Sequence, residues 1–181
     1  MVDTYVSNGL QAVEVAWDAP GIWGGPRART LACRFATVAQ WIHGNLHQPG
    51  PGMVFIAQGT SGGAAQIAFG LAYYGIDSFV TLASLSGGPP YCPLCTGPLP
   101  TREPILSGTP KLSYPNTTVR LFLGVNDPNS DGTVDSARAY YDAVASQKSL
   151  QMISNTGHDV EATSEGQAAL RAAVQGALGL A

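Results

Sequence analysis

The stretch from Val54 to Gly75, VFIAQGTSGGAAQIAFGLAYYG, decides the fold. A short apolar run ends at G-T-S-G-G, and an alanine-rich run with helical spacing follows at once. This order predicts a strand, a sharp turn and a helix that ends at Gly75. The G-x-S-x-G pattern around Ser61 is typical of the turn that lifts a nucleophilic serine clear of a parallel sheet.

The glycines around Ser61 fit such a turn. Gly59 and Gly63 leave room for the backbone, and Gly62 would open the following helix. Its N–H would face an anion forming beside Ser61, where the helix dipole also favours negative charge. A chain with 22 glycines produces some matches by chance, but the strand-like and helical flanks favour the functional interpretation. Ser61 is therefore the candidate nucleophile and Gly62 a candidate oxyanion donor.

Apolar segments elsewhere predict further strands and helices in alternation. Strands are expected at residues 12–17, 79–83, 119–125 and 150–154, and helices at 27–45, about 134–147 and about 164–178. Such alternation predicts an α/β fold, with a mostly parallel sheet and helices on both faces. At 181 residues we expect a single domain covering 1–181.

Residues 87–118 break this alternation, because they form a long stretch rich in Pro, Gly, Thr and Ser. We expect a lid-like loop insertion that forms one wall of a substrate pocket, and a passive surface loop is the alternative. Trp23 and Tyr91 are predicted to line this apolar pocket, and Thr60, beside the nucleophile, to contact the substrate.

Composition excludes several classes of function. Only 12 % of the residues are charged and the net charge is −3, so there is no basic face for nucleic acid or anionic lipid. No apolar run approaches the roughly 20 residues of a membrane span. Residues 1–10 lack the basic start and apolar stretch of a signal peptide.

The cysteines and histidines do not predict a metal site. Cys92 and Cys95 form a C-x-x-C in a Gly/Pro-rich loop, without the helix that redox motifs use, and the histidines are not at finger spacing around them. A disulfide from Cys33 to Cys92 or Cys95 is the preferred interpretation, and it implies an oxidising compartment. His43 and His47, near a helix end, are expected to be structural.

A serine needs a base within hydrogen-bond reach and an acid that orients the base. His158, in N-T-G-H-D, follows the last predicted strand, so it can approach Ser61 across the carboxyl edge of the sheet. Asp127, in G-V-N-D, follows the strand before it and is the first choice for the acid. Asp131 and Asp135 are the alternatives if the loop folds differently.

The order Ser61, Asp127, His158 resembles that of the α/β-hydrolase superfamily over nearly the whole chain. The segments AWDAPGIWGG, LACR, SGGAAQIAFGLAYYG and SGGPP are most similar to secreted bacterial hydrolases. The resemblance implies ester hydrolysis through an acyl-enzyme, no cofactor, a small-molecule or polymeric ester as substrate, and secretion. Thioester and amide substrates are the alternatives.

One departure from the superfamily concerns the start of the chain. Superfamily members carry strands before the point where this chain begins, and a loop after one of them supplies the second oxyanion N–H. Either residues 12–17 take the inner strand position and residues 21–25 supply a substitute donor, or the chain is truncated. Loss of one donor costs about 3 kcal/mol of transition-state stabilisation. The alternative function is therefore a weak or inactive hydrolase-fold binding protein, and an exposed sheet edge could pair two copies in a homodimer.

Overall fold

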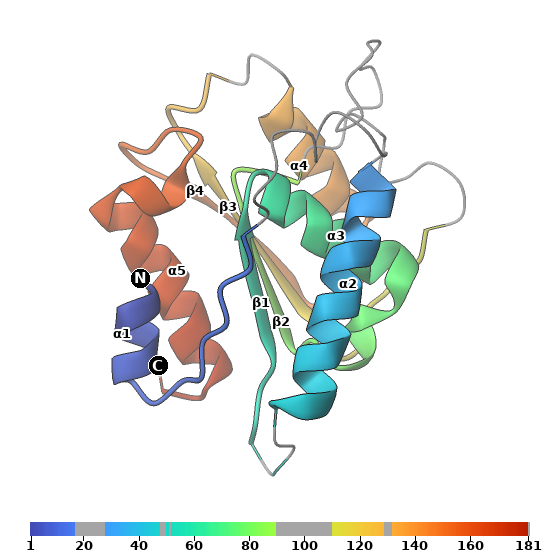
Figure 1. Ribbon diagram of the computed structural model, residues 1–181. Helices are drawn as coiled ribbons and strands as arrows, with labels where there is room; N and C mark the ends of the chain where they lie inside the picture. The colour runs from blue at the N-terminus through green and yellow to red at the C-terminus, as the bar shows by residue number, and fades with distance from the viewer. Residues whose placement is uncertain (17–27, 48–49, 51, 90–109, 129–131, 181) are drawn as a thin grey trace.

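The computed structural model describes residues 1–16, 28–47, 50, 52–89, 110–128 and 132–180. Its centre is a parallel sheet with the strand order β1-β2-β3-β4 (Figure 1). The strands are β1 (Ile56–Thr60), β2 (Leu82–Ser86), β3 (Thr118–Gly124) and β4 (Lys148–Ile153). Each pairs with the next in sequence, so all the carboxyl ends lie at one edge of the sheet.

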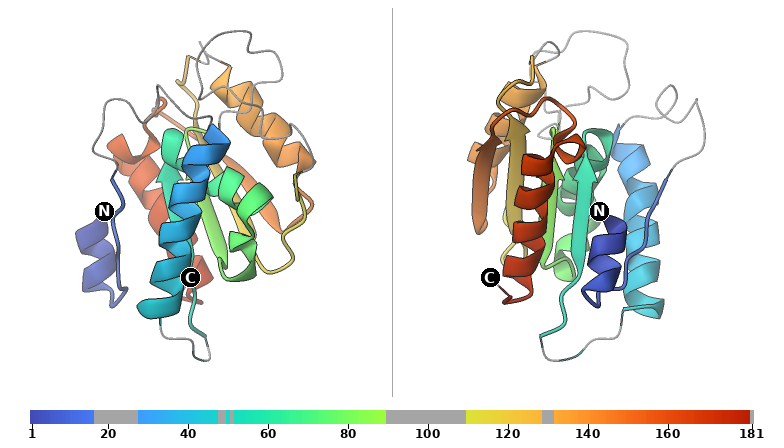
Figure 2. Two further views of the ribbon diagram at one scale, coloured as in Figure 1. Left: turned by 45° about the vertical axis from the view of Figure 1, so that its right-hand side comes forward. Right: turned by 90° about the vertical axis from the view of Figure 1, so that its left-hand side faces the viewer.

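Helices cover both faces of this sheet, as the sequence predicted (Figures 1 and 2). On one face, α2 (Ala28–Asn45), α3 (Gly62–Tyr74) and α4 (Thr133–Ala143) pack with β-strand side chains in the larger hydrophobic core. On the other face, α5 (Ser164–Ala177) buries Leu170 and Ala173 against the sheet, and α1 (Val2–Ser7) lies beside it. Two short 3-10 turns, η1 (Ile76–Ser78) and η3 (Val160–Ala162), precede β2 and α5.

Strand side chains alternate between these two cores, which explains the two-sided burial. Leu121 and Leu123 of β3 belong to the larger core, and Phe122 between them belongs to the smaller one. Both faces of the central strands are therefore buried, as expected for a parallel sheet covered on both sides, although the face toward α5 also carries Ser84 and Ser86 of β2.

The expectation of a strand over residues 12–17 was wrong. Residues 11–16 pair with no strand, and Val13 is 48 % exposed, so the alternating apolar side chains are not buried. Trp17 lies outside the described residues. Within the described chain, β1 is an edge strand, and the Tyr5 hydroxyl of α1 donates to Gln58 Oε1 on it at 2.9 Å.

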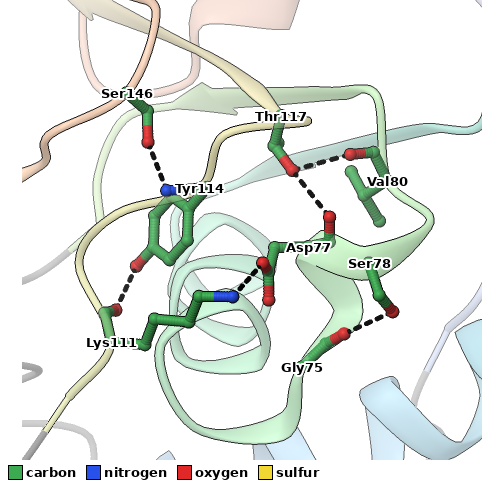
Figure 3. Close-up of polar contacts among 8 residues, drawn as sticks. All are labelled: Gly75, Asp77, Ser78, Val80, Lys111, Tyr114, Thr117 and Ser146. Atoms are coloured by element: carbon green, nitrogen blue, oxygen red, sulfur yellow. Dashed lines mark hydrogen bonds and ion pairs between the residues drawn. The ribbon is translucent and has the colours of Figure 1, made fainter.

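Hydrogen bonds and an ion pair hold residues 110–117 at the amino ends of the strands (Figure 3). Lys111 forms an ion pair with the buried Asp77 of η1, and the Tyr114 hydroxyl donates to the Lys111 carbonyl at 2.8 Å. The Thr117 hydroxyl donates to the Val80 carbonyl at 2.7 Å. This part of the predicted lid is thus anchored away from the carboxyl edge, and residues 90–109 lie outside the described residues.

Candidate active site

Ser61 occupies the turn between β1 and α3 in a strained backbone conformation. Its φ is 52° and its ψ is −111°, values that L side chains rarely adopt outside functional turns. A Cβ on Gly59 would lie 2.7 Å from the Gly63 carbonyl carbon, so only glycine allows the strand and helix to approach this closely. The predicted strand, elbow and helix are present, and α3 ends at Gly75 in the left-handed conformation.

His158 and Asp127 converge on Ser61 from two other strand ends. The His158 Nε2 lies 2.9 Å from the Ser61 Oγ, and the His158 Nδ1 lies 3.0 Å from the Asp127 Oδ2. The Asp127 side chain is 3 % exposed and the His158 side chain 34 %. With Asp127 ionised, the Nδ1 carries the proton and donates to it, which leaves the Nε2 free to accept the hydroxyl proton of Ser61.

Gly62 is the first residue of α3. Its N–H is one of the four at a helix start that have no acceptor within the helix. The helix dipole places partial positive charge at this end, so the arrangement suits an anion forming next to Ser61. The Ser61 amide itself donates to the Ser86 carbonyl at 2.8 Å.

The loop that carries His158 lies directly on two glycines at the strand ends. A Cβ on Gly87, after β2, would lie 2.5 Å from the His158 carbonyl oxygen. A Cβ on Gly124, at the end of β3, would overlap the carbonyl oxygens of Thr156 and Gly157. The Asn126 amide donates to the Thr156 carbonyl at 2.9 Å. These backbone contacts thus fix the distance between the loop at residues 156–158 and the carboxyl ends of β2 and β3, a distance called the height of the loop below.

Thr60 lies at the site, but its hydroxyl already has protein partners. It donates to Glu161 Oε2 at 2.8 Å and lies 2.7 Å from the Ser86 Oγ. Sequence reasoning missed Glu161 and Ser86. Ser86 ends a strand, which is a weak signal for a site residue, and nothing in the sequence links Glu161 to a threonine 101 positions earlier.

Several predicted site residues cannot be placed. Trp23, Tyr91, Asp131 and residues 21–25 lie outside the described residues, so the predicted pocket wall and second oxyanion donor stay predictions. Asp135 lies in the first turn of α4, whereas Asp127 is the carboxylate that contacts His158.

The cysteines and the other histidines lie apart from this arrangement. Cys33 is a free, exposed thiol on α2, so the disulfide expected from it is absent; Cys92 and Cys95 lie outside the described residues. His43 and His47 stack on each other at the amino edge, and both contact Phe55, consistent with a structural role. Among the described residues, no group of three metal-binding side chains occurs, and no helix is long and apolar enough to cross a membrane.

Comparison with solved structures finds matches to two esterases. Thermogutta terrifontis esterase 2, in its apo form, matches with a TM-score of 0.55 and 17 % identity over 86 % of this chain and 63 % of its own. A Bacillus cereus carboxylesterase matches with a TM-score of 0.49 and 17 % identity over 82 % of this chain and 59 % of its own. No protein-family model and no curated protein sequence matches the chain.

The likeness to the Thermogutta esterase, together with the parallel sheet and its flanking helices, shows an α/β-hydrolase-like fold. At 17 % identity the likeness concerns the fold alone. The chain spans about three fifths of the length of these esterases. The chemistry of the site must therefore be argued from its own residues.

Proposed function

We propose that the chain is a serine hydrolase that cleaves carboxylic esters through an acyl-enzyme. The observation that carries this proposal is the continuous pair of hydrogen bonds from Ser61 through His158 to Asp127, at 2.9 and 3.0 Å. This arrangement can activate a serine hydroxyl. Ser61 lies on a strained turn, the His158 Nε2 can accept its proton, and the buried Asp127 carboxylate contacts the other ring nitrogen.

In the proposed reaction, the Ser61 Oγ attacks the ester carbonyl carbon while His158 Nε2 takes its proton. Asp127 holds the ring in the required tautomer and stabilises the imidazolium. The carbonyl oxygen becomes an oxyanion, to which the Gly62 N–H would donate. The imidazolium then gives its proton to the leaving alcohol, and the acyl group stays on Ser61. Water then gives a proton to His158 Nε2 and attacks the acyl carbon, and His158 returns this proton to the Ser61 Oγ as the bond to the acyl group breaks and the acid leaves.

The experiment that tests this proposal is labelling of the folded protein with a fluorophosphonate probe, followed by peptide mapping. We expect a stoichiometric adduct on Ser61. Ser61→Ala should abolish it, and His158→Ala should slow it at least a thousandfold, because members of such a set act as a unit. Ser78→Ala is the matched control, since Ser78 is an exposed serine at the opposite edge of the sheet and should leave the rate unchanged.

The alternative, a binding protein without catalysis, predicts a different result. A cooperatively folded sample with no adduct on Ser61, or with an adduct independent of His158, would contradict the proposed hydrolase. If labelling occurs, a panel of p-nitrophenyl esters, thioesters and polyesters would then separate the candidate substrate classes. Secretion and a homodimer through an exposed sheet edge stay predictions from the sequence.

A further inference from the structure

A second side-chain contact runs parallel to that between Ser61 and His158. Thr60, the residue before Ser61, donates to Glu161, the third residue after His158. The two contacts therefore join the same two segments, the end of β1 and the loop after β4. Those segments lie at opposite sides of a four-stranded sheet, three strand spacings or about 14 Å apart. The loop after β4 has to reach across β3 and β2. The hydrogen bonds between strands do not set its position along this direction, which is called its lateral position below.

The partners of Thr60 and Glu161 make this contact directional. A hydroxyl has one proton, and a carboxylate is the stronger acceptor, so Thr60 gives its proton to Glu161. The Ser86 hydroxyl, fully buried at the end of β2, then donates to the Thr60 Oγ1 at 2.7 Å, with the Gly59 carbonyl as a more distant second acceptor at 3.3 Å. The Glu161 backbone carbonyl accepts from Gln167 Nε2 on α5 at 3.0 Å. Thr60 is thus held from β2, and Glu161 is held from α5.

We propose that Glu161 and Thr60 are positioning residues that set the lateral alignment of His158 with Ser61. This inference rests on the function proposed above and deepens it. The His158 side chain is one third exposed, so packing alone does not hold its ring. The Thr60 to Glu161 bond supplies the missing lateral constraint, whereas Gly87 and Gly124 fix the height of the loop. Glu161 contacts Thr60 and acts through it.

This role differs from the substrate contact that the sequence suggested for Thr60. A substrate-binding hydroxyl would affect KM and would not depend on Glu161. A positioning pair should lower kcat and the labelling rate, and leave KM within about twofold, because misalignment of reacting atoms raises the barrier to the chemical step. Loss of either partner removes the same bond, so the two effects should not add.

The test uses the whole chain and four variants of this pair. Thr60→Val and Glu161→Ala should each slow fluorophosphonate labelling and lower kcat for a p-nitrophenyl ester about tenfold, and the double variant should be no slower than the slower single one. Thr60→Ser keeps the hydroxyl and should retain the parent rate. Thr81→Val is the matched control, because the Thr81 hydroxyl also joins the chain at β2 to the chain at β1, but just before both strands, where it donates to the Phe55 carbonyl at 3.0 Å.

The outcomes separate this inference from the proposed function. If the parent labels at Ser61 and Thr60→Val and Glu161→Ala keep its rate, the positioning role is wrong and the hydrolase proposal stands. If Thr81→Val slows labelling as much as Thr60→Val, the effect is general destabilisation and the inference fails. A raised KM in Thr60→Val with Glu161→Ala unchanged assigns Thr60 to the substrate. If the folded parent does not label, both proposals fail.

Discussion

Replacement of Gly87 by alanine should displace His158 while the fold persists. The added Cβ would lie 2.5 Å from the His158 carbonyl oxygen and 3.5 Å from its Cε1, and ordinary contacts begin at 3.4 Å. The loop must therefore move by about 0.9 Å, since the obstacle is backbone and not a flexible side chain. A misplacement of about 1 Å costs on the order of a hundredfold in rate. The left-handed φ of 54° adds about 1 to 2 kcal/mol of strain to the folded state.

Two alanine variants separate displacement from strain. Gly75→Ala also puts an L side chain at a positive φ, 68°, but its Cβ meets nothing within 4 Å. Gly157→Ala places a methyl group beside His158 in open space. Rates of Ser61 labelling and thermal unfolding would be measured for all three. We expect a roughly hundredfold slower rate for Gly87→Ala alone. Equal rates in Gly87→Ala and the parent, or an equal loss in Gly75→Ala, would refute the reasoning.

Two further predictions concern the polar contacts at the amino edge. Burial raises the pKa of Tyr114 from 10.0 to about 12, and burial also raises the pKa of Tyr140. As the pH rises, the unfolded chain releases these protons at a lower pH than the folded chain, so the unfolding free energy should fall between about pH 10 and pH 12. Urea titrations across this range should show a shallower fall for Tyr114→Phe. A fall identical to that of the parent would contradict the raised pKa of Tyr114. Lys111→Met should lower the unfolding free energy by about 2 kcal/mol, because Asp77 is left buried without its cation. Adding Asp77→Asn to the Lys111→Met variant should recover part of this loss, and urea titrations would measure both changes.

Local patterns predicted most elements within a few residues. The elbow was predictable because its glycines, apolar strand and helical run are contiguous. The second strand was placed at residues 79–83, yet β2 covers Leu82–Ser86. Its buried Ser84 and Ser86 look like polar loop residues in the sequence, whereas the largely apolar residues 79–81 connect η1 to β2 and are not part of a strand. Helix α4 ends at Ala143, earlier than predicted, because the Ala145 amide pairs with the Leu112 carbonyl, a contact between distant segments.

The convergence of the three residues proposed to react was predictable from topology, since each follows a strand and the carboxyl ends of parallel strands share an edge. The residues that align them were not. Thr60 looked available to substrate because its partner Glu161 lies far along the chain. The wrong prediction of a strand at residues 12–17 has a related cause. Alternating apolar and polar side chains do not show whether a neighbouring strand is available for pairing.

The contact between Ser61 and His158 joins residues 97 positions apart and spans the whole sheet, from the strand at one side to the loop beyond the strand at the other. Contacts of such sequence separation form late, because loop-closure entropy opposes them until the intervening strands have paired. In a refolding experiment, the ability of Ser61 to react with a covalent probe should therefore appear after the helical circular dichroism signal has returned. The rate of probe labelling at Ser61 would thus report when the sheet is complete.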